Sequence, residues 1–236
     1  MQPPRRRKGL QLPLSPRLSV ALTTDGPAPD LLRIGSISPR TTAEGPGLRF
    51  AVWAQGCSIR CTGCFNPHFW ATAGGQDVVV EDIARQAIDA GVDGVTLLGG
   101  EPFEQAPAFA ALGKKVREAG LSMMVFSGFE REFLESGDAP DGAAALLAQT
   151  DLLVDGPYLA DKRDLGRPWV GSTNQRFHFL TDRYRHLEEN LKGMPDRIEV
   201  RISPMGAVAI NGWAPVDRLD TLLDDLTPRV GRGQVQ

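Results

Sequence analysis

Apolar residues follow two patterns along this chain, short runs typical of strands and helical i, i+3, i+4 spacing. Residues 80–90 and 108–119 carry the helical pattern. Short apolar runs at 95–100, 121–128 and 151–157 predict buried strands. Strands and helices therefore alternate in the middle of the chain. This order is typical of an α/β fold with βα units around a parallel sheet.

Weaker signals extend this core on both sides. Residues 32–37 predict a first strand. Residues 45–56 predict a turn followed by a second strand, and this strand is apolar on both faces, as in a sheet that is covered on both sides. Residues 140–149 predict a helix, and RFHFL at 176–180 a strand. The intervening segment 157–174 lacks a period and contains prolines and glycines, which indicates a long functional loop.

The two ends of the chain differ from this core in composition. Residues 1–30 are rich in Pro and Arg and predict a disordered basic arm, and 31–228 would form one domain. Two alternating runs at 198–212 predict a hairpin. A last helix with Leu219, Leu222, Leu223 and Leu226 on one face would precede a frayed tail, 229–236.

Composition narrows the possible partners. The 236 residues include 26 Lys and Arg and 29 Asp and Glu, a net charge of −3, so nothing overall suggests nucleic-acid binding. No apolar run approaches a membrane span, and no long apolar segment follows the basic run at 5–8, which argues against a secretory signal. We therefore expect a cytoplasmic protein without membrane or nucleic-acid partners.

All three cysteines lie within eight positions of one another, at Cys57, Cys61 and Cys64. Thiols spaced C-x3-C-x2-C can converge on one inorganic centre, and they leave one coordination position open. A zinc site closed by His68 is an alternative. A disulfide fits less well, because the cysteine count is odd and no secretory signal is evident.

The cysteine spacing, on a loop after a predicted strand, resembles the radical S-adenosylmethionine (radical SAM) enzymes. This resemblance implies a [4Fe-4S] cluster held by Cys57, Cys61 and Cys64, with SAM on the open iron. It also implies reductive cleavage of SAM to a 5'-deoxyadenosyl radical and a fold that is a partial (βα) barrel. The family's glycine-rich SAM motif is matched by Gly99, Gly100, Glu101 and Pro102 at the end of a predicted strand. There Glu101 would receive the methionyl amino group, or alternatively only start a helix.

Further motifs narrow the resemblance to the activating enzymes of glycyl-radical enzymes. EGPGLRF at 44–50 resembles D-G-P-G-I-R, and 56–70 resembles G-C-x3-C-x-x-C-x-N-P-x-x-W. DGPY at 155–158 and GSTNQRF at 171–177 look most like the activating proteins of anaerobic ribonucleotide reductase, the 4Fe-4S single cluster domain family. Glu44 departs from the family's Asp, and Gly63 stands where many members carry an aromatic ring, which Phe65 or Phe69 could supply instead.

The resemblance assigns further residues to the site. It places Asn66 in the cofactor-binding loop and Asp155 near a ribose hydroxyl, although Asp155 could equally be a turn residue. Four residues of the later loop could either order it or contact SAM or a partner: Ser172, Asn174, Gln175 and Arg176. His178 and His186 fit ordinary strand and helix positions.

The leading interpretation is a radical SAM oxidoreductase that generates a glycyl radical on a partner enzyme, with an electron donor such as flavodoxin or ferredoxin. A barrel open on one side would admit such a polypeptide substrate. One alternative is radical modification of a peptide or small metabolite. A second is a non-catalytic iron-sulfur or zinc module that docks another protein.

Overall fold

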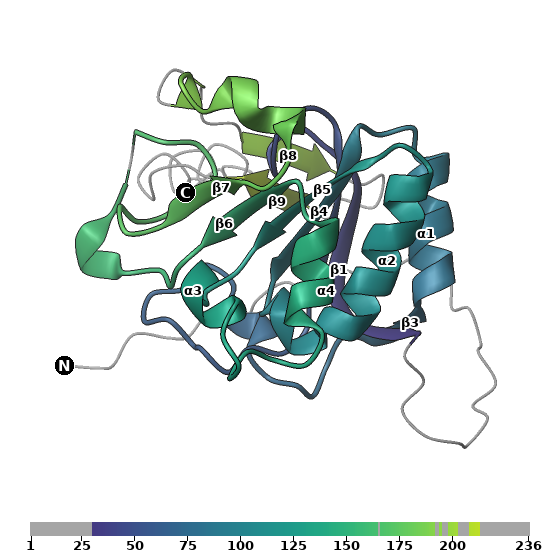
Figure 1. Ribbon diagram of the computed structural model, residues 1–236, viewed down its shortest axis with the longest axis horizontal. Helices are drawn as coiled ribbons and strands as arrows, with labels where there is room; N and C mark the ends of the chain where they lie inside the picture. Colours follow the sequence, from purple (N-terminus) through teal and green to yellow (C-terminus); the bar gives the residue numbers. More distant parts are fainter. Residues whose placement is uncertain (1–29, 165, 192–193, 195–197, 203–207, 213–236) are drawn as a thin grey trace, which may run out of the picture.

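A seven-stranded mixed sheet forms the middle of the protein (Figure 1). The computed structural model describes residues 30–164, 166–191, 194, 198–202 and 208–212. The strands of the sheet are β1 (Leu31–Thr41), β2 (Arg49–Ala54), β3 (Gln76–Val79), β4 (Gly94–Gly99), β5 (Ser122–Phe126), β6 (Leu152–Asp155) and β7 (Arg176–Phe179). They are arranged in the order β3-β1-β2-β4-β5-β6-β7.

Helices join these strands and cover one face of the sheet. The α-helices are α1 (Val80–Asp89), α2 (Ala106–Glu118), α3 (Arg131–Leu134) and α4 (Ala143–Gln149). The described residues also form the 3-10 helices η1 (Pro67–Phe69), η2 (Pro102–Gln105), η3 (Ala160–Lys162) and η4 (Asp182–Leu187). In Figure 1, α1, α2 and α4 lie side by side against the sheet. The predicted α/β class is confirmed in this form, a mixed α/β fold with a large sheet.

The sheet is parallel only in its centre, which corrects the expectation of a parallel sheet throughout. Strands β2, β4, β5 and β6 are parallel, whereas β1, β3 and β7 pair antiparallel with their neighbours. Parallel neighbours need a crossover of about a dozen residues or more, usually a helix. Only residues 42–48 connect β1 to β2, so this pair must be antiparallel. The segment 156–175 contains no α-helix, and the chain returns beside β6 in the opposite direction.

The core is built mainly on the helical face. Phe50, Val52, Leu97 and Phe109 are essentially inaccessible there. The opposite face carries two smaller clusters, one around Trp53 and one around Met124, Leu152 and Tyr184. All six residues of β2 are buried, which confirms that this strand lies inside a covered sheet.

The predicted hairpin is present as β8 (Ile198–Ile202) and β9 (Val208–Gly212), paired antiparallel. It contacts the segment after β1, where Glu199 Oε1 accepts a 2.6 Å hydrogen bond from Thr42 N. Three predicted segments lie outside the described residues: the arm 1–30, except for residue 30 itself, the helix over residues 219–226, and the tail 229–236.

Two of the short elements, β3 and α3, were not expected from the sequence, whereas His186 lies in a helical turn, η4, as expected. The four residues of β3 are exposed or half-buried, so they show no apolar period; the strand exists because it pairs with β1. Among the described residues, no helix combines the length and apolar character that a membrane crossing requires.

Candidate metal centre

The three cysteines lie on the loop that leaves the carboxyl end of β2. The four central strands are parallel, so their carboxyl ends lie at one edge of the sheet, where α/β folds place their ligand sites. Arg60 and Gly63 adopt positive φ angles of 50° and 81°. At Gly63 a side chain would be strained by this φ angle, which favours glycine there.

Each thiol has backbone N–H groups directed at its sulfur. Asn66 N donates to Cys64 Sγ over 3.4 Å. Burial raises the pKa of Cys57, while hydrogen bonds from the amides of Arg60 and Ile59 oppose the shift. Burial also raises the pKa of Cys61, opposed by the amide of Tyr158. Amides pointing at sulfur stabilise the thiolate form that iron requires.

The donor set therefore fits an open iron-sulfur cluster, with three free, half-buried thiols on one loop. In the described part of the chain, no group of three or more His, Cys, Asp or Glu side chains is already placed to hold a metal ion. His68 is exposed, and its ring contacts Phe69 at a centroid distance of 4.0 Å.

The Gly99–Pro102 segment is attached to the cysteine loop. Gly100 N donates to Ala54 O and Glu101 N donates to Gly56 O, both over 2.8 Å. A Cβ at Gly100 would lie 2.1 Å from Gly56 O, and Gly99 has a φ of +102°. Pro102 is buried and opens η2, where its missing N–H is not needed. Both glycines are thus required by close approach and by backbone conformation.

Glu101 is a buried carboxylate, and no cation of the described residues pairs with it. Its Oε1 accepts from Phe103 N and from Ser127 Oγ, both over 3.0 Å. Its Oε2 accepts from Gly128 N over 2.8 Å. Burial raises the pKa of Glu101 to about 7, against the effect of these hydrogen bonds. The bond to Phe103 N caps η2, so the predicted helix-start role is real, but it leaves the charge uncompensated.

Asp155, at the end of β6, is equally buried but has cationic neighbours. Arg176 contacts it through Nε at 3.1 Å and Nη2 at 2.7 Å. Arg131 N donates to Asp155 Oδ2 over 2.6 Å. His178 Nε2 lies 3.0 Å from the same oxygen, but this contact lacks hydrogen-bond geometry. The oxygens of Asp155 are therefore engaged by the protein itself.

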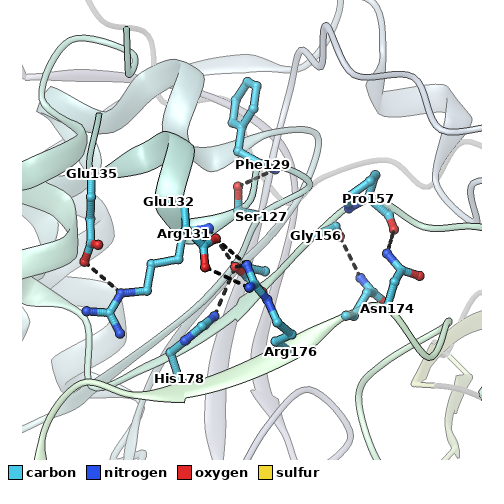
Figure 2. A network of polar contacts seen from close by, with 12 residues as sticks. Ser127, Phe129, Arg131, Glu132, Glu135, Gly156, Pro157, Asn174, Arg176 and His178 are labelled. Atoms are coloured by element: carbon cyan, nitrogen blue, oxygen red, sulfur yellow. Dashed lines mark hydrogen bonds and ion pairs between the residues drawn. The ribbon is translucent and has the colours of Figure 1, made fainter. Parts of the chain in front are cut away.

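The loop 156–175 is ordered by its own polar residues. Ser172 Oγ accepts from Leu159 N, and Gln175 Oε1 accepts from Gly171 N over 2.7 Å. Asn174 Nδ2 donates to Pro157 O over 2.7 Å, as Figure 2 shows. Ser172, Asn174, Gln175 and Arg176 thus all make hydrogen bonds that order this loop or its anchor.

This loop also lies against the cysteine loop. Besides the amide contact to Cys61, the rings of Tyr158 and Phe65 meet edge to face at a centroid distance of 6.3 Å. Phe65 is 46% exposed, whereas Phe69 is buried beside Trp53. Of the two rings considered for a ligand contact, Phe65 is therefore the accessible one.

Comparison with known proteins identifies the family. The model of the 4Fe-4S single cluster domain matches residues 43–178, more than half of the chain. This chain belongs to the 4Fe-4S single cluster domain family. The match spans all of the contacts above, and membership confirms the expected radical SAM oxidoreductase with a [4Fe-4S] cluster and SAM as cofactors.

Several proteins with similar sequences are activating proteins. The chain is 30% identical over 156 residues to the anaerobic ribonucleoside-triphosphate reductase-activating protein of Escherichia coli K12, which covers 60% of this chain and 95% of the relative. The Vibrio cholerae protein of the same name is 29% identical over 61% of this chain and 95% of its own length. The pyruvate formate-lyase-activating enzyme of Listeria monocytogenes is 34% identical over 52% of this chain, which spans only 51% of that enzyme.

A solved structure shows a weaker likeness. It is QueE from Escherichia coli, with a TM-score of 0.36 and 17% identity over 42% of this chain and 52% of that one.

Sequence reasoning missed several residues that support the cluster domain. Glu104 Oε1 accepts from Ser58 N over 2.7 Å and so holds the cysteine loop. Gln105 Nε2 donates to the carbonyl oxygens of Arg33 and Gln55, at 3.0 and 3.1 Å. The only local sequence signal for either residue was that Glu104 is acidic and lies in the first turn after Pro102. Nothing local identifies the distant partners.

Proposed function

We propose that this protein uses a cluster bound by Cys57, Cys61 and Cys64 to generate a glycyl radical on a partner protein. The observation that carries the proposal is the buried carboxylate of Glu101, uncompensated by any cation in the described residues, beside the three-cysteine loop. A buried anion without a counter-charge is unstable alone and complementary to an incoming ammonium group. SAM carries such a group on its methionyl end.

The residues of the site have distinct tasks. Oε2 of Glu101 accepts one hydrogen bond, and a carboxylate oxygen can accept another, which would orient the methionyl ammonium. Gly99 and Gly100 would form the strand edge beside the ligand, where they allow the close approach of Trp53 and Gly56, and Asn66 would supply an amide to Cys64. A reduced cluster held by Cys57, Cys61 and Cys64 would supply the electron for reductive cleavage of SAM, and the chemistry gained would be hydrogen abstraction from the substrate.

The relatives support a protein substrate. The two relatives whose alignment with this chain covers 95% of their own length are named as activating proteins of an anaerobic ribonucleoside-triphosphate reductase. We extend that role to this chain, together with a partial barrel open toward the partner, a domain spanning 31–228, a cytoplasmic location and an external one-electron donor protein. Asp155 is assigned a supporting role here in place of a ribose contact, because its oxygens are already engaged.

Anaerobic reconstitution of the full chain with iron and sulfide tests the metal site. We expect about four irons per chain and loss of the cluster in Cys57→Ala, Cys61→Ala and Cys64→Ala, because each thiolate would hold one iron. Thr62→Ala, on the same loop without a thiol, is the matched control. Stoichiometric zinc with His68 as a ligand would establish the zinc-module alternative instead.

The substrate is tested by electron paramagnetic resonance. With reductant and SAM alone, slow uncoupled cleavage is expected. Adding an anaerobic reductase encoded in the same genome should produce a glycyl radical and 5'-deoxyadenosine. A partner that stays free of radical while SAM is consumed would favour modification of a peptide or metabolite.

A further inference from the structure

The segment 127–131, after β5, lies between two buried carboxylates. On one side, Ser127 Oγ and Gly128 N donate to Glu101 at 3.0 and 2.8 Å. On the other side, Arg131 N donates to Asp155 Oδ2 at 2.6 Å. The segment is thus the physical connection between the end of β4 and the end of β6.

Backbone contacts make this connection stiff. Ser127 N donates to Val154 O over 2.9 Å, and Gly156 N donates to Phe129 O over 3.1 Å. Ser127 Oγ also accepts from Phe129 N over 3.0 Å while it donates to Glu101. A shift of the Asp155 end would therefore be transmitted to the two donors that orient the Glu101 carboxylate.

Arg176 determines the position of the Asp155 end. Its guanidinium contacts both oxygens of Asp155 and, through Nη1 and Nη2, both oxygens of Glu132 in α3, at 2.8 and 2.6 Å (Figure 2). The planar fork of an Arg suits such paired contacts with two carboxylates. Arg176 also lowers the pKa of Glu132 to about 2, so this bridge persists across the physiological pH range.

We propose that Arg176 is a positioning residue for SAM binding: by joining Asp155 to Glu132 it fixes segment 127–131 and, through that segment, the carboxylate of Glu101. The inference rests on the proposed function, in which Glu101 receives the methionyl ammonium. Arg176 itself acts from a distance, since its fork is occupied by protein carboxylates. A small displacement of an orienting group is sufficient to weaken binding, because charge-assisted hydrogen bonds depend on geometry.

The first test measures SAM affinity of the reconstituted full chain by equilibrium dialysis. Arg176→Met should weaken SAM binding about 10-fold, the loss of roughly one hydrogen bond to a charged group. Arg176→Lys keeps the charge without the fork and should recover part of the affinity. Arg185→Met is the matched control: it removes an exposed 2.8 Å ion pair with Asp182 that lies outside segment 127–131, and it should leave SAM affinity unchanged.

A double-mutant cycle with Glu101→Gln separates this mechanism from general destabilisation. If Arg176 acts through Glu101, Arg176→Met should change SAM affinity less than about 2-fold once Glu101 is already Gln. Iron content and thermal midpoints of all variants identify those that have lost the fold. If Arg176→Met does not fold, Arg176→Lys and Glu132→Gln complete the same cycle.

The outcomes distinguish the inference from the proposed function. Additive effects in the cycle, or a SAM affinity unchanged by the Arg176 variants while Glu101→Gln weakens it, would overturn the inference alone. If Glu101→Gln itself leaves SAM affinity unchanged, the proposed role of Glu101 fails and the inference fails with it.

Discussion

The carbonyl oxygen of Gly56 accepts a 2.8 Å hydrogen bond from the amide of Glu101. The residue before the first cysteine is therefore joined directly to the acidic residue at the end of β4. The cysteine loop and the SAM-binding edge proposed here form one unit as a result. Substitutions on either side of this contact should affect both cluster and SAM binding.

Gly100→Ala should disrupt this unit. The new Cβ would lie 2.1 Å from Gly56 O, and the backbone would have to move apart. We expect destabilisation by about 1 to 3 kcal/mol and a reduced iron content after reconstitution. Gly137→Ala is the control, because an added Cβ there meets no atom within 4 Å. Full iron content in the Gly100 variant would show that the loop tolerates displacement.

Glu101→Ala should weaken SAM binding about 10- to 150-fold, the range for a charge-assisted hydrogen bond. It should also lower stability, because Phe103 N, Ser127 Oγ and Gly128 N lose their acceptor. Equilibrium dialysis and thermal unfolding measure the two effects separately. A destabilised variant with unchanged SAM affinity would restrict Glu101 to the capping of η2.

Glu44 should make stability depend on pH. Burial raises the pKa of this half-buried carboxyl to about 7, although Gly212 N donates to it over 2.9 Å. Its contribution is complete below the unfolded pKa near 4.5 and is lost as pH rises through 7. The difference between wild type and Glu44→Gln should therefore change between pH 4.5 and 7, by roughly 3 kcal/mol at most. Glu101 titrates in the same window, so only this difference isolates Glu44.

The thermal midpoints of both proteins, measured from pH 4.5 to 8, give this difference. Parallel curves for wild type and Glu44→Gln would mean that Glu44 does not titrate in this window.

Arg49→Lys should be poorly tolerated although it conserves charge. Arg49 is inaccessible, and its guanidinium donates to Thr96 Oγ1, Ser122 Oγ, Tyr184 OH and Val95 O at 2.6–3.0 Å. One ammonium cannot reach all four acceptors, so unfolding should become easier by about 1 to 3 kcal/mol. Denaturant unfolding measures this loss, with Arg85→Lys in an exposed pair as control. Equal losses in the two variants would contradict the role of the buried fork.

The sequence alone determined the central elements and the donor set. The regular spacing of apolar residues locates α1, α2 and the central strands, because a helix or strand that buries one face needs apolar residues at the period of that element. The three cysteines and the Gly99–Pro102 segment are local motifs, so their spacing is readable without a fold. Strand β3 was not readable, because its exposed residues gain their conformation only from pairing with β1.

The tertiary structure decided which carboxylate is free to meet a cation. Glu101 and Asp155 both follow buried strands, and the sequence assigned both to cofactor binding. Only the fold places Arg176, 21 positions away, on Asp155, while no cation of the described residues reaches Glu101. The compensation of a buried charge depends on partners brought together through space. Local sequence therefore identified the two acids, and long-range packing gave only Asp155 a cationic partner among the described residues.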